Sequence, residues 1–396
     1  MIDLGEAEHM VERNIISRVV LRNYKSIRDC DVSLGPITFL VGPNGAGKSN
    51  FVDALRFVAQ ALNTSLEEAL NSRFGFAGIL YREAPRPSAF SIEVFFSLRG
   101  DKEESRYKVE IEAPDPDTYL VKREECRRGD AWFEVSRGNL KTDQAIAPPV
   151  PEDKLYLLNA SGMPVFEPVY RLLSAMEVYN PVPDDIRNAR VERTHKHLDR
   201  KASGLGEAVS RLKERMPERL DRVLEYLRRV NRDVQDVKVR KNDFLYVLTS
   251  TLNGNEFLSD NMSDGTLRAM AVLVALFQKP LYPLTWVGLE EPEAGLHPAA
   301  AAVLFDALIE ASHFSQVVVT SHSPDLLDRE DIPEDSIRAV VMHEGRTIIG
   351  DVDDAGKSAL RNQLYTAGEL MRMDQLFAEG PAPCRPFQVT LPGLDS

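Results

Sequence analysis

A glycine-rich stretch at residues 39–52, FLVGPNGAGKSNFV, limits what this chain can fold into more than any other feature of the sequence. It fits the pattern G-x-x-x-x-G-K-[ST], whose specified residues here are Gly42, Gly47, Lys48 and Ser49. In such a loop the glycines let backbone N–H groups converge on a polyphosphate, the lysine reaches the β- and γ-phosphates, and the hydroxyl binds Mg²⁺. The apolar run before the loop predicts a buried strand, and the apolar spacing after it predicts a helix, which is the context that the pattern requires.

Length and composition set the frame around this loop. At 396 residues the chain exceeds the usual single domain of about 100–150 residues, so we expect one large α/β unit with an inserted or appended subdomain. No opening signal peptide is present, and no window approaches the roughly 18 uninterrupted apolar residues of a membrane span, so we expect a cytoplasmic protein without a membrane partner. The cysteines, Cys30, Cys126 and Cys384, show neither metal nor disulfide spacing.

Alternating apolar and polar residues predict an antiparallel meander over 90–98, 105–113, 118–125 and 131–136. Around it we expect three parts. Residues 1–178 form an N-terminal lobe with the phosphate loop and the meander, residues 179–241 a basic helical insertion, and residues 242–396 a C-terminal lobe. The predicted fold class is α/β, a mixed sheet with an antiparallel β subdomain and an inserted helical subdomain.

The insertion is the only basic part of an otherwise acidic chain. Residues 185–241 hold seventeen Lys and Arg against ten Asp and Glu, whereas the whole chain has a net charge of -13. The surplus runs from Arg187 to Lys241 and is typical either of a solvated helix face or of a surface that binds phosphates, DNA included. Because Tyr226 is its only Phe, Tyr or Trp, a nucleic acid is expected to be contacted through its backbone. Four of its charges lie in no nucleotide motif and are expected to act independently of the phosphate loop: Arg193, Lys196, Arg200 and Lys201.

Two further apolar runs predict buried strands that end in chemically active side chains. One is followed by Glu290, Glu291 and, close by, Glu293, and the other, QVVVTSH, ends in His322. In α/β sheets ligands bind at the carboxyl edge of the strands. Three carboxylates there repel one another unless a cation or a proton-transfer role compensates, which favours a functional interpretation. At this edge we expect His322 to contact a γ-phosphate.

Two weaker signals accompany these runs. An apolar helix begins at Ser263, Asp264 and Gly265, and a helix N-terminus suits a phosphate, although an ordinary capped helix has the same pattern. Lys25 and Ser26 precede the phosphate loop and are able to turn back toward it, although a solvated turn is the simpler interpretation.

In this order the pieces resemble the ABC-type ATPases of the RecF/SMC/OLD group. GPNGAGKSN resembles the Walker A motif of that group, MSDGT its signature motif, VGLEEPEAGLHP its Walker B motif and D-loop, VVVTSHSP its histidine switch, and RNYKSI the strand that opens these domains. The resemblance implies a P-loop NTPase fold of ABC type with ATP and Mg²⁺ as cofactors. The nucleotide-binding residues that it implies are Lys25, Ser26, Gly42, Pro43, Asn44, Gly45, Ala46, Gly47, Lys48, Ser49 and Asn50, and, from a second subunit, Ser263, Asp264 and Gly265.

The resemblance also implies chemical roles. Glu290 and Ser49 would hold Mg²⁺ or its water, Glu291 would orient the attacking water, and Lys48 and His322 would act on the phosphates. Two features depart from the pattern. Glu290 stands where many ABC enzymes have Asp, and no Q-loop is found because no Gln occurs between residues 60 and 144.

Within the group, the chain is most similar to stand-alone OLD-type and phage-defence ATPases, on the basis of EEP followed by HP, YNPVPDDIRN and TAGELMRMDQL. No sustained heptads are present, so coiled-coil arms are not expected. OLD proteins carry a Toprim nuclease, for which Asp351 and Asp353 superficially offer a D-x-D pair. The end of a hairpin explains that pair better, so a nuclease is expected only as a separate partner.

Three functions are compatible with these features. The first is a Mg²⁺-dependent ATPase that forms a homodimer or higher oligomer around ATP and drives or licenses an effector, a Toprim-like nuclease, in DNA-linked anti-phage defence. The second is a RecF-like DNA-repair ATPase. The third is a nucleotide-gated scaffold with negligible turnover.

Overall fold

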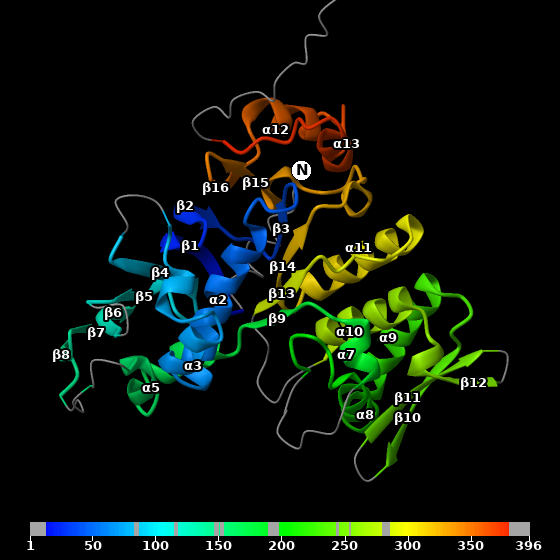
Figure 1. The fold of residues 1–396 in the computed structure, drawn as a ribbon, viewed down its shortest axis with the longest axis horizontal. Helices are drawn as coiled ribbons and strands as arrows, with labels where there is room; N and C mark the ends of the chain where they lie inside the picture. Colours follow the sequence, from blue (N-terminus) through cyan, green and yellow to red (C-terminus); the bar gives the residue numbers. More distant parts are fainter. Residues whose placement is uncertain are drawn as a thin grey trace, which may run out of the picture.

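The computed structural model describes residues 13–82, 87–114, 118–145, 150, 154–188, 198–242, 245–252, 255–278 and 286–379, with residues 240–252 described by their backbone alone. Arg193 and Lys196 of the basic insertion, and Cys384, lie outside this part of the chain. In Figure 1 helix α2 (Lys48–Asn63) lies between an antiparallel sheet and a mainly parallel one, with a group of helices on the far side of the parallel sheet.

The antiparallel sheet has seven strands in the order β2-β1-β4-β5-β6-β7-β8. Their bounds are β1 Ile15–Tyr24, β2 Ile27–Ser33, β4 Ala89–Ser97, β5 Ser105–Glu112, β6 Leu120–Arg128, β7 Ala131–Ser136 and β8 Asn139–Thr142. Alternate residues are buried along β5 and β6, as expected when one face of a sheet packs on a core and the other faces solvent. The predicted meander corresponds to β4–β7, and the sheet also takes in β1, β2 and β8.

The second sheet has six strands in the order β16-β15-β3-β14-β13-β9, all parallel except the hairpin partner β16. Their bounds are β3 Ile37–Val41, β9 Glu177–Tyr179, β13 Trp286–Glu290, β14 Gln316–Ser321, β15 Ile337–His343 and β16 Arg346–Asp351. Along β14, Val317 and Val319 pack in one core and Val318 in the other. Burial on both faces explains why these strands are continuous apolar runs. The mixed α/β sheet that the sequence predicts is confirmed.

Helix α2 is buried on almost every side because it fills the space between the two sheets. It packs against α3 (Leu66–Asn71) and α6 (Glu167–Ser174). The short helices α4 (Phe76–Ile79) and α5 (Tyr156–Ala160) complete this lobe.

The inserted subdomain contains α7 (Pro183–Arg187), α8 (Leu205–Arg215) and α9 (Pro217–Val230), and Pro217 begins the last of these helices. A three-stranded sheet follows, formed by β10 (Asp236–Asn242), β11 (Leu245–Leu252) and β12 (Asn255–Leu258). Residue 241, where the sequence places the end of the insertion, lies inside the β10–β11 hairpin, in which Lys241 pairs with Tyr246. The boundary at residue 178 likewise cuts strand β9, which belongs to the parallel sheet.

The helices α10 (Asp264–Phe277) and α11 (Pro298–Ser312) cover the face of the parallel sheet opposite α2. The chain then passes through η2 (Pro324–Leu326) and η3 (Glu334–Ser336) to α12 (Asp354–Arg361) and α13 (Ala367–Arg372), and η1 (Ser259–Asn261) precedes α10. In the part of the chain described, no helix is both long enough and apolar enough to cross a membrane.

One buried carboxylate ties α5 to the antiparallel sheet. Glu124 on β6 is fully buried and accepts hydrogen bonds from the Tyr107 hydroxyl (3.0 Å) and from the backbone amides of Tyr156 (2.5 Å) and Leu157 (2.9 Å). Burial raises the pKa of Glu124 to about 7, against the opposing effect of these three donors.

Replacing Glu124 is expected to lower the free energy of unfolding and to reduce the dependence of that free energy on pH. Glu124→Ala leaves three buried donors unsatisfied and should lower the free energy of unfolding by about 3 kcal/mol, whereas Tyr107→Phe removes one donor and should cost about 1 kcal/mol. Because the folded pKa of about 7 lies above the ordinary 4.5, the proton stabilises the native state fully below pH 4.5, and this contribution is lost as the pH rises through 7. Chemical unfolding between pH 4 and 8 measures both effects. If the free energy of unfolding changed equally with pH in wild type and Glu124→Ala, the assigned role of the Glu124 proton would be contradicted.

Candidate functional site

The glycine-rich loop leaves the carboxyl end of β3 and enters α2 directly. Gly45 and Gly47 have φ angles of 78° and 101°, in the left-handed region that favours glycine. The backbone amides of Gly47, Lys48 and Ser49 donate to no acceptor within residues 13–82 or elsewhere in the described chain. Free amides at a helix N-terminus form a binding site for an anion.

The other loop residues divide between an exposed tip and a packed base. Pro43, Asn44 and Gly45 are exposed, as is Ser49 at the start of the helix, whereas Ala46 is buried. At the base, a Cβ on Gly42 would lie 1.9 Å from the Val340 carbonyl oxygen, and one on Gly47 would lie 2.0 Å from Thr347 Oγ1. The loop is therefore pressed against the β15–β16 hairpin, and only glycine fits at these two positions.

Ser26 lies beside the loop, and its assignment as a phosphate contact stays a prediction. Its hydroxyl shares a hydrogen bond with Thr347 Oγ1 (2.6 Å) and accepts one from Asn50 Nδ2 (2.7 Å). The Thr347 amide donates to the Ser26 carbonyl (2.9 Å), which closes the network. Thr347 was not predicted from the sequence, since nothing in its own neighbourhood marks it.

The side chain of Lys48 is folded onto the loop. Its ammonium donates to the carbonyls of Gly42 (2.8 Å) and Pro43 (2.9 Å), and the residue is buried. Burial lowers the pKa of Lys48, while the charges of Glu291 and Glu293 oppose that shift. The lysine thus lies within electrostatic reach of the acidic motif and has donors to exchange for phosphate oxygens.

Parallel pairing brings the predicted residues to one edge of the sheet. Ser321 of β14 pairs with Val41 of β3, and Glu290 of β13 pairs with Thr320 of β14. The loop amide of Gly42 donates to the Ser321 carbonyl at 3.4 Å. The glycine loop, the acidic residues and His322 therefore all begin where three adjacent strands end.

Glu291 is held in an unusual conformation. Its φ is 46°, and its amide donates to the Thr320 carbonyl at 2.9 Å. Its Oε1 lies 3.1 Å from His322 Nδ1, within ion-pair distance but without a hydrogen bond. Left-handed backbone at a non-glycine residue costs free energy and is concentrated at functional sites. The arrangement presents a half-exposed carboxylate and an imidazole side by side, which suits orientation of a water molecule.

Glu293 is the member of the acidic motif for which no role was assigned from the sequence. It is 5% exposed, accepts a hydrogen bond from the Ser321 hydroxyl (2.5 Å), and leaves Oε2 without a partner among the described residues. Burial raises the pKa of Glu293, while the Ser321 hydrogen bond opposes the rise. The spacing E-x-x-E over a tight turn was the signal that could have identified it.

Lys25 is engaged in the core of the N-terminal lobe. Its ammonium lies 2.6 Å from Asp53 Oδ2 on α2, and the buried guanidinium of Arg73 holds both carboxylate oxygens of Asp53 at 2.9 Å. Burial alone would raise the pKa of Asp53, but Arg73, Lys25 and Arg56 hold that pKa well below its usual range. The structure does not bring the Lys25 ammonium to the phosphate loop, so its assignment as a phosphate contact stays a prediction.

The signature segment lies at the start of α10. Ser263 caps the helix by accepting from the Thr266 amide (3.2 Å), Asp264 pairs with Arg187 (2.5 Å), and a Cβ on Gly265 would lie 2.9 Å from the Gly295 carbonyl oxygen. In the described chain, no hydrogen bond or ion pair joins these three residues to the phosphate loop of the same subunit. Their assignment to a neighbouring subunit's nucleotide stays a prediction.

Asn180 also lies at this edge of the parallel sheet. It follows β9, whose Tyr179 pairs with Leu289 of β13, so it reaches the same sheet edge as Glu290. Arg268 of α10 donates to both Asn180 Oδ1 (3.1 Å) and the Glu291 carbonyl (3.2 Å). This arginine connects the helix that begins at the signature segment to the acidic motif.

Part of the charge of the basic insertion is paired with acidic residues from elsewhere in the chain. Seven of its described Lys and Arg side chains form ion pairs, and five of these are with acidic residues outside the insertion: Arg187–Asp264, Arg200–Glu290, Arg222–Glu310, Arg229–Asp306 and Lys238–Glu256. This pairing weakens the attraction of the surface for phosphates. Arg200 lies in no nucleotide motif of the sequence, but it contacts one in the fold, because its Nη2 lies 2.7 Å from Glu290 Oε1.

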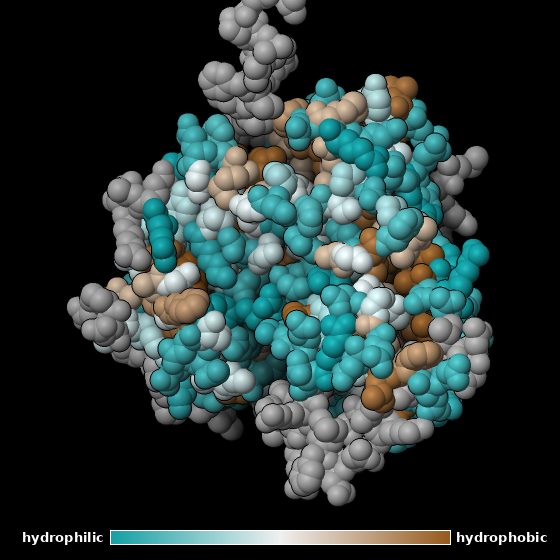
Figure 2. Space-filling model, turned by 45° about the vertical axis from the view of Figure 1, so that its right-hand side comes forward, coloured by the Kyte–Doolittle hydropathy of each residue, from teal (hydrophilic) through white to brown (hydrophobic). Residues whose placement is uncertain are grey.

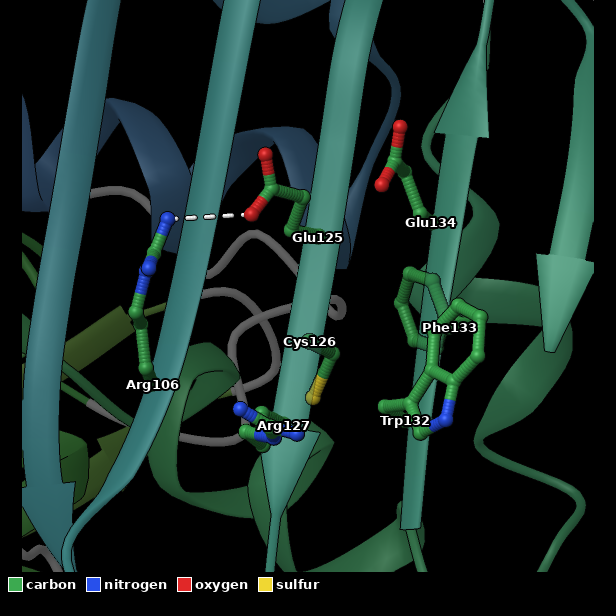
Figure 3. A pocket seen from close by; sticks show the side chains of 7 residues that line it. All are labelled: Arg106, Glu125, Cys126, Arg127, Trp132, Phe133 and Glu134. Carbon is green, nitrogen blue, oxygen red and sulfur yellow. Dashed lines mark hydrogen bonds and ion pairs between the residues drawn. The ribbon is translucent and has the colours of Figure 1, made fainter. Parts of the chain in front are cut away.

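Other candidate positions carry structural roles. Asp351 pairs with Arg338 and Lys357, and Asp353 caps α12, as expected for the end of a hairpin. A pocket of about 260 Å³ on the antiparallel sheet is lined by an ion-paired surface, with Arg106 and Glu125 joined across β5 and β6 and Glu134 on β7 (Figure 3). It contains none of the motif residues. On the face drawn in Figure 2, hydrophilic residues predominate and apolar ones form small separate patches.

The residues at the sheet edge fit a magnesium–nucleoside triphosphate. The free loop amides and Lys48 supply donors for phosphate oxygens, and the unpartnered Glu293 Oε2 is a buried acceptor beside them. Mg²⁺ binds through one or two protein oxygens together with phosphates and water, which matches Ser49 and Glu290 as the donor set. When bound, the ion would neutralise charge on the phosphates, and the protein side chains would supply orientation.

A model of one protein family matches residues 37–328 of this chain, and that family is described as AAA domain, putative AbiEii toxin, Type IV TA system. Among curated proteins, the DNA replication and repair protein RecF of Vibrio vulnificus (strain YJ016) is 34% identical over 59 residues, 15% of this chain and 16% of RecF. The OLD nuclease of Thermus scotoductus is 41% identical over 44 residues, 11% of this chain and 8% of the nuclease. The matches span less than a fifth of each curated relative.

Solved structures of SMC head domains share the fold. An SMC head bound to the C-terminal winged-helix domain of ScpA has a TM-score of 0.56 at 15% identity, covering 86% of this chain and 99% of the head. An SMC head with an extended coiled coil from Pyrococcus furiosus has a TM-score of 0.54 at 13% identity, covering 89% and 100%. The two sheets and the order of the motifs are those of an ABC-type P-loop NTPase.

The Asp53 cluster is expected to determine the stability of the helix that carries the loop. Asp53→Asn leaves the buried Arg73 without a full counter-charge and should lower the free energy of unfolding by about 3 kcal/mol or more. Lys25→Met removes the better-solvated partner and should cost about 1 kcal/mol or less. Chemical unfolding of both variants makes the comparison, and equal losses would refute the special role of the buried Arg73–Asp53 pair.

Proposed function

We propose that this chain hydrolyses ATP with Mg²⁺ and dimerises head to tail around the nucleotide. The chain belongs to the family described as AAA domain, putative AbiEii toxin, Type IV TA system. It is an ABC-type ATPase of the RecF/SMC/OLD group. One observation carries the proposal. The free amides of the glycine loop, the Glu290–Glu291 pair and His322 converge on one edge of the parallel sheet.

In this proposal each side chain acts on a specific part of the reaction. Lys48 exchanges the carbonyls of Gly42 and Pro43 for phosphate oxygens and neutralises charge that develops on them. Glu291 orients the attacking water and accepts its proton, while His322 is positioned beside it to contact the γ-phosphate. Ser49 and Glu290 hold the Mg²⁺ ion.

We further propose that the ATPase drives or licenses a separate effector in anti-phage defence, with a Toprim-like nuclease as the expected partner. Similarity to a segment of an OLD nuclease and the family description support this assignment. Similarity to a segment of RecF supports the alternative of a DNA-repair ATPase, for which DNA binding through residues 187–241 would be needed. Because five basic side chains of that segment are paired with acids outside it, we rank direct DNA binding below a protein partner.

Co-purification from the native host separates these roles. An effector nuclease that is retained with the ATPase would support defence, and repair-clamp proteins retained in its place would support the RecF-like alternative. Recovery of the ATPase with neither, while it binds but does not turn over ATP, would favour the nucleotide-gated scaffold.

Glu291→Gln is expected to bind ATP normally and to lose turnover by on the order of 10²-fold or more, because the amide keeps the shape but cannot accept the proton. Lys48→Ala should instead lose nucleotide binding. Asp221→Asn, at an exposed carboxylate on α9, serves as the matched control and should leave both properties unchanged. Steady-state phosphate release and equilibrium nucleotide binding make the measurements, and normal turnover in Glu291→Gln would refute its catalytic role.

Ser263→Arg is expected to prevent ATP-dependent dimerisation, because it places bulk and charge where the signature segment would meet the partner's nucleotide. Ser263→Ala loses the same helix cap, worth about 1 kcal/mol, without the bulk, and should still dimerise. Light scattering with and without ATP measures whether each variant dimerises. Dimers of undiminished stability in Ser263→Arg would rule out the arrangement between subunits.

A further inference from the structure

Glu290 lies at the sheet edge with a counter-ion that comes from the inserted subdomain. Its side chain is 8% exposed, and Arg200 Nη2 lies 2.7 Å from its Oε1. The two residues are 90 positions apart in the sequence. A buried carboxylate without a counter-charge is strongly destabilising, so in the absence of a metal ion this arginine supplies the compensation.

Arg200 is held in place by its backbone. The Asn180 amide donates to the Arg200 carbonyl (2.7 Å), and the Val182 amide donates to the Lys201 carbonyl (3.0 Å). These bonds attach the arginine to the segment that follows β9 at the same sheet edge. Its position beside Glu290 is therefore built into the fold.

The turn that carries Arg200 also connects to the first long helix of the insertion. Asp199 accepts hydrogen bonds from the amides of Lys201 and Gly204, each at 2.9 Å, and from the Ser203 hydroxyl, and Gly204 is the N-cap of α8. A compact, hydrogen-bonded turn therefore joins the backbone of Arg200 to α8.

The guanidinium is only partly satisfied at this position. Its Nε is buried and has no hydrogen-bond partner in the described chain, and the arginine side chain is 38% exposed. If Arg200 leaves Glu290, a single ion pair is therefore lost and an unsatisfied donor returns to water. If Arg200 stayed in place while a divalent cation bound the same carboxylate, the two cations would repel each other.

We propose that Arg200 is the resident counter-ion of Glu290, that Mg²⁺–ATP displaces it, and that this displacement reports nucleotide binding to the inserted subdomain through the turn at 199–204. The inference rests on the proposed function, since it requires Mg²⁺–ATP at the sheet edge. It adds a sensor in the insertion that acts on the metal ligand from within the same subunit.

Competition with Mg²⁺ tests the first half of the proposal. In Arg200→Gln, the Mg²⁺ concentration that gives half-maximal binding of a fluorescent ATP analogue should fall by about three- to tenfold, because the metal no longer displaces a cation. Arg200→Lys keeps the charge and should resemble wild type. Lys201→Gln is the matched control, because Lys201 pairs with Asp185 and not with Glu290.

A double variant separates the ion pair from general effects of the substitution. In a Glu290→Gln background, Arg200→Gln should leave the Mg²⁺ dependence unchanged. An undiminished effect in that background, or a wild-type Mg²⁺ dependence in Arg200→Gln alone, would overturn the proposal. Failure of the wild-type protein to bind the analogue at any Mg²⁺ concentration would instead refute the proposed function.

Hydrogen exchange tests the second half of the proposal, the response of the inserted subdomain, without any ATP hydrolysis. On addition of Mg²⁺–ATP to the Glu291→Gln protein, the amides of Asn180 and Val182 and the turn at 199–204 should exchange faster, because the bonds that hold Arg200 are loosened. In Arg200→Gln the same peptides should show no nucleotide-dependent change. A change of equal size in both proteins would show that the insertion responds by another route and would refute the sensor.

Discussion

Parallel pairing of β3, β14 and β13 determines where every charged residue of the site lies. A strand buried on both faces is mostly apolar along its length, so exposed reactive side chains gather at and beyond its end. Since neighbouring parallel strands end at the same edge, the glycine loop, His322 and the acidic motif are brought together by backbone hydrogen bonds alone. The register between strands therefore sets the geometry of the site before any side chain makes a contact.

Two buried carboxylates of the protein are compensated in different ways. Asp53 is surrounded by Arg73, Lys25 and Arg56, all from the lobe that contains α2, and forms a fixed part of the core. Glu290 has a partner from a separate subdomain, and that partner retains an unsatisfied donor. Similar electrostatic requirements thus produce a permanent cluster in one place and an exchangeable ion pair in the other.

The sequence predicts the parts of the site that depend on local pattern. Strand ends and spacing predict the glycine loop between β3 and α2, the two acidic positions at the end of β13 and the histidine after β14. Contacts between distant segments have no such signature. Thr347 reaches the loop from a hairpin some 300 residues later, and the pairing of Arg200 with Glu290 depends on how the insertion folds back. The predicted boundary at residue 241 falls inside a hairpin, because a change in charge composition does not mark where a hairpin ends.

At Glu291 the residue that best fits the left-handed backbone differs from the residue that carries the carboxylate. Glycine would adopt a φ of 46° without steric cost, so a substitution chosen for thermal stability alone would remove this carboxylate. Retaining glutamate keeps strained backbone at the edge of an otherwise regular sheet. A heat-resistant variant of this protein that keeps its chemistry therefore has to gain its stability elsewhere, in the cores on either side of the parallel sheet or in the surface ion pairs of the insertion.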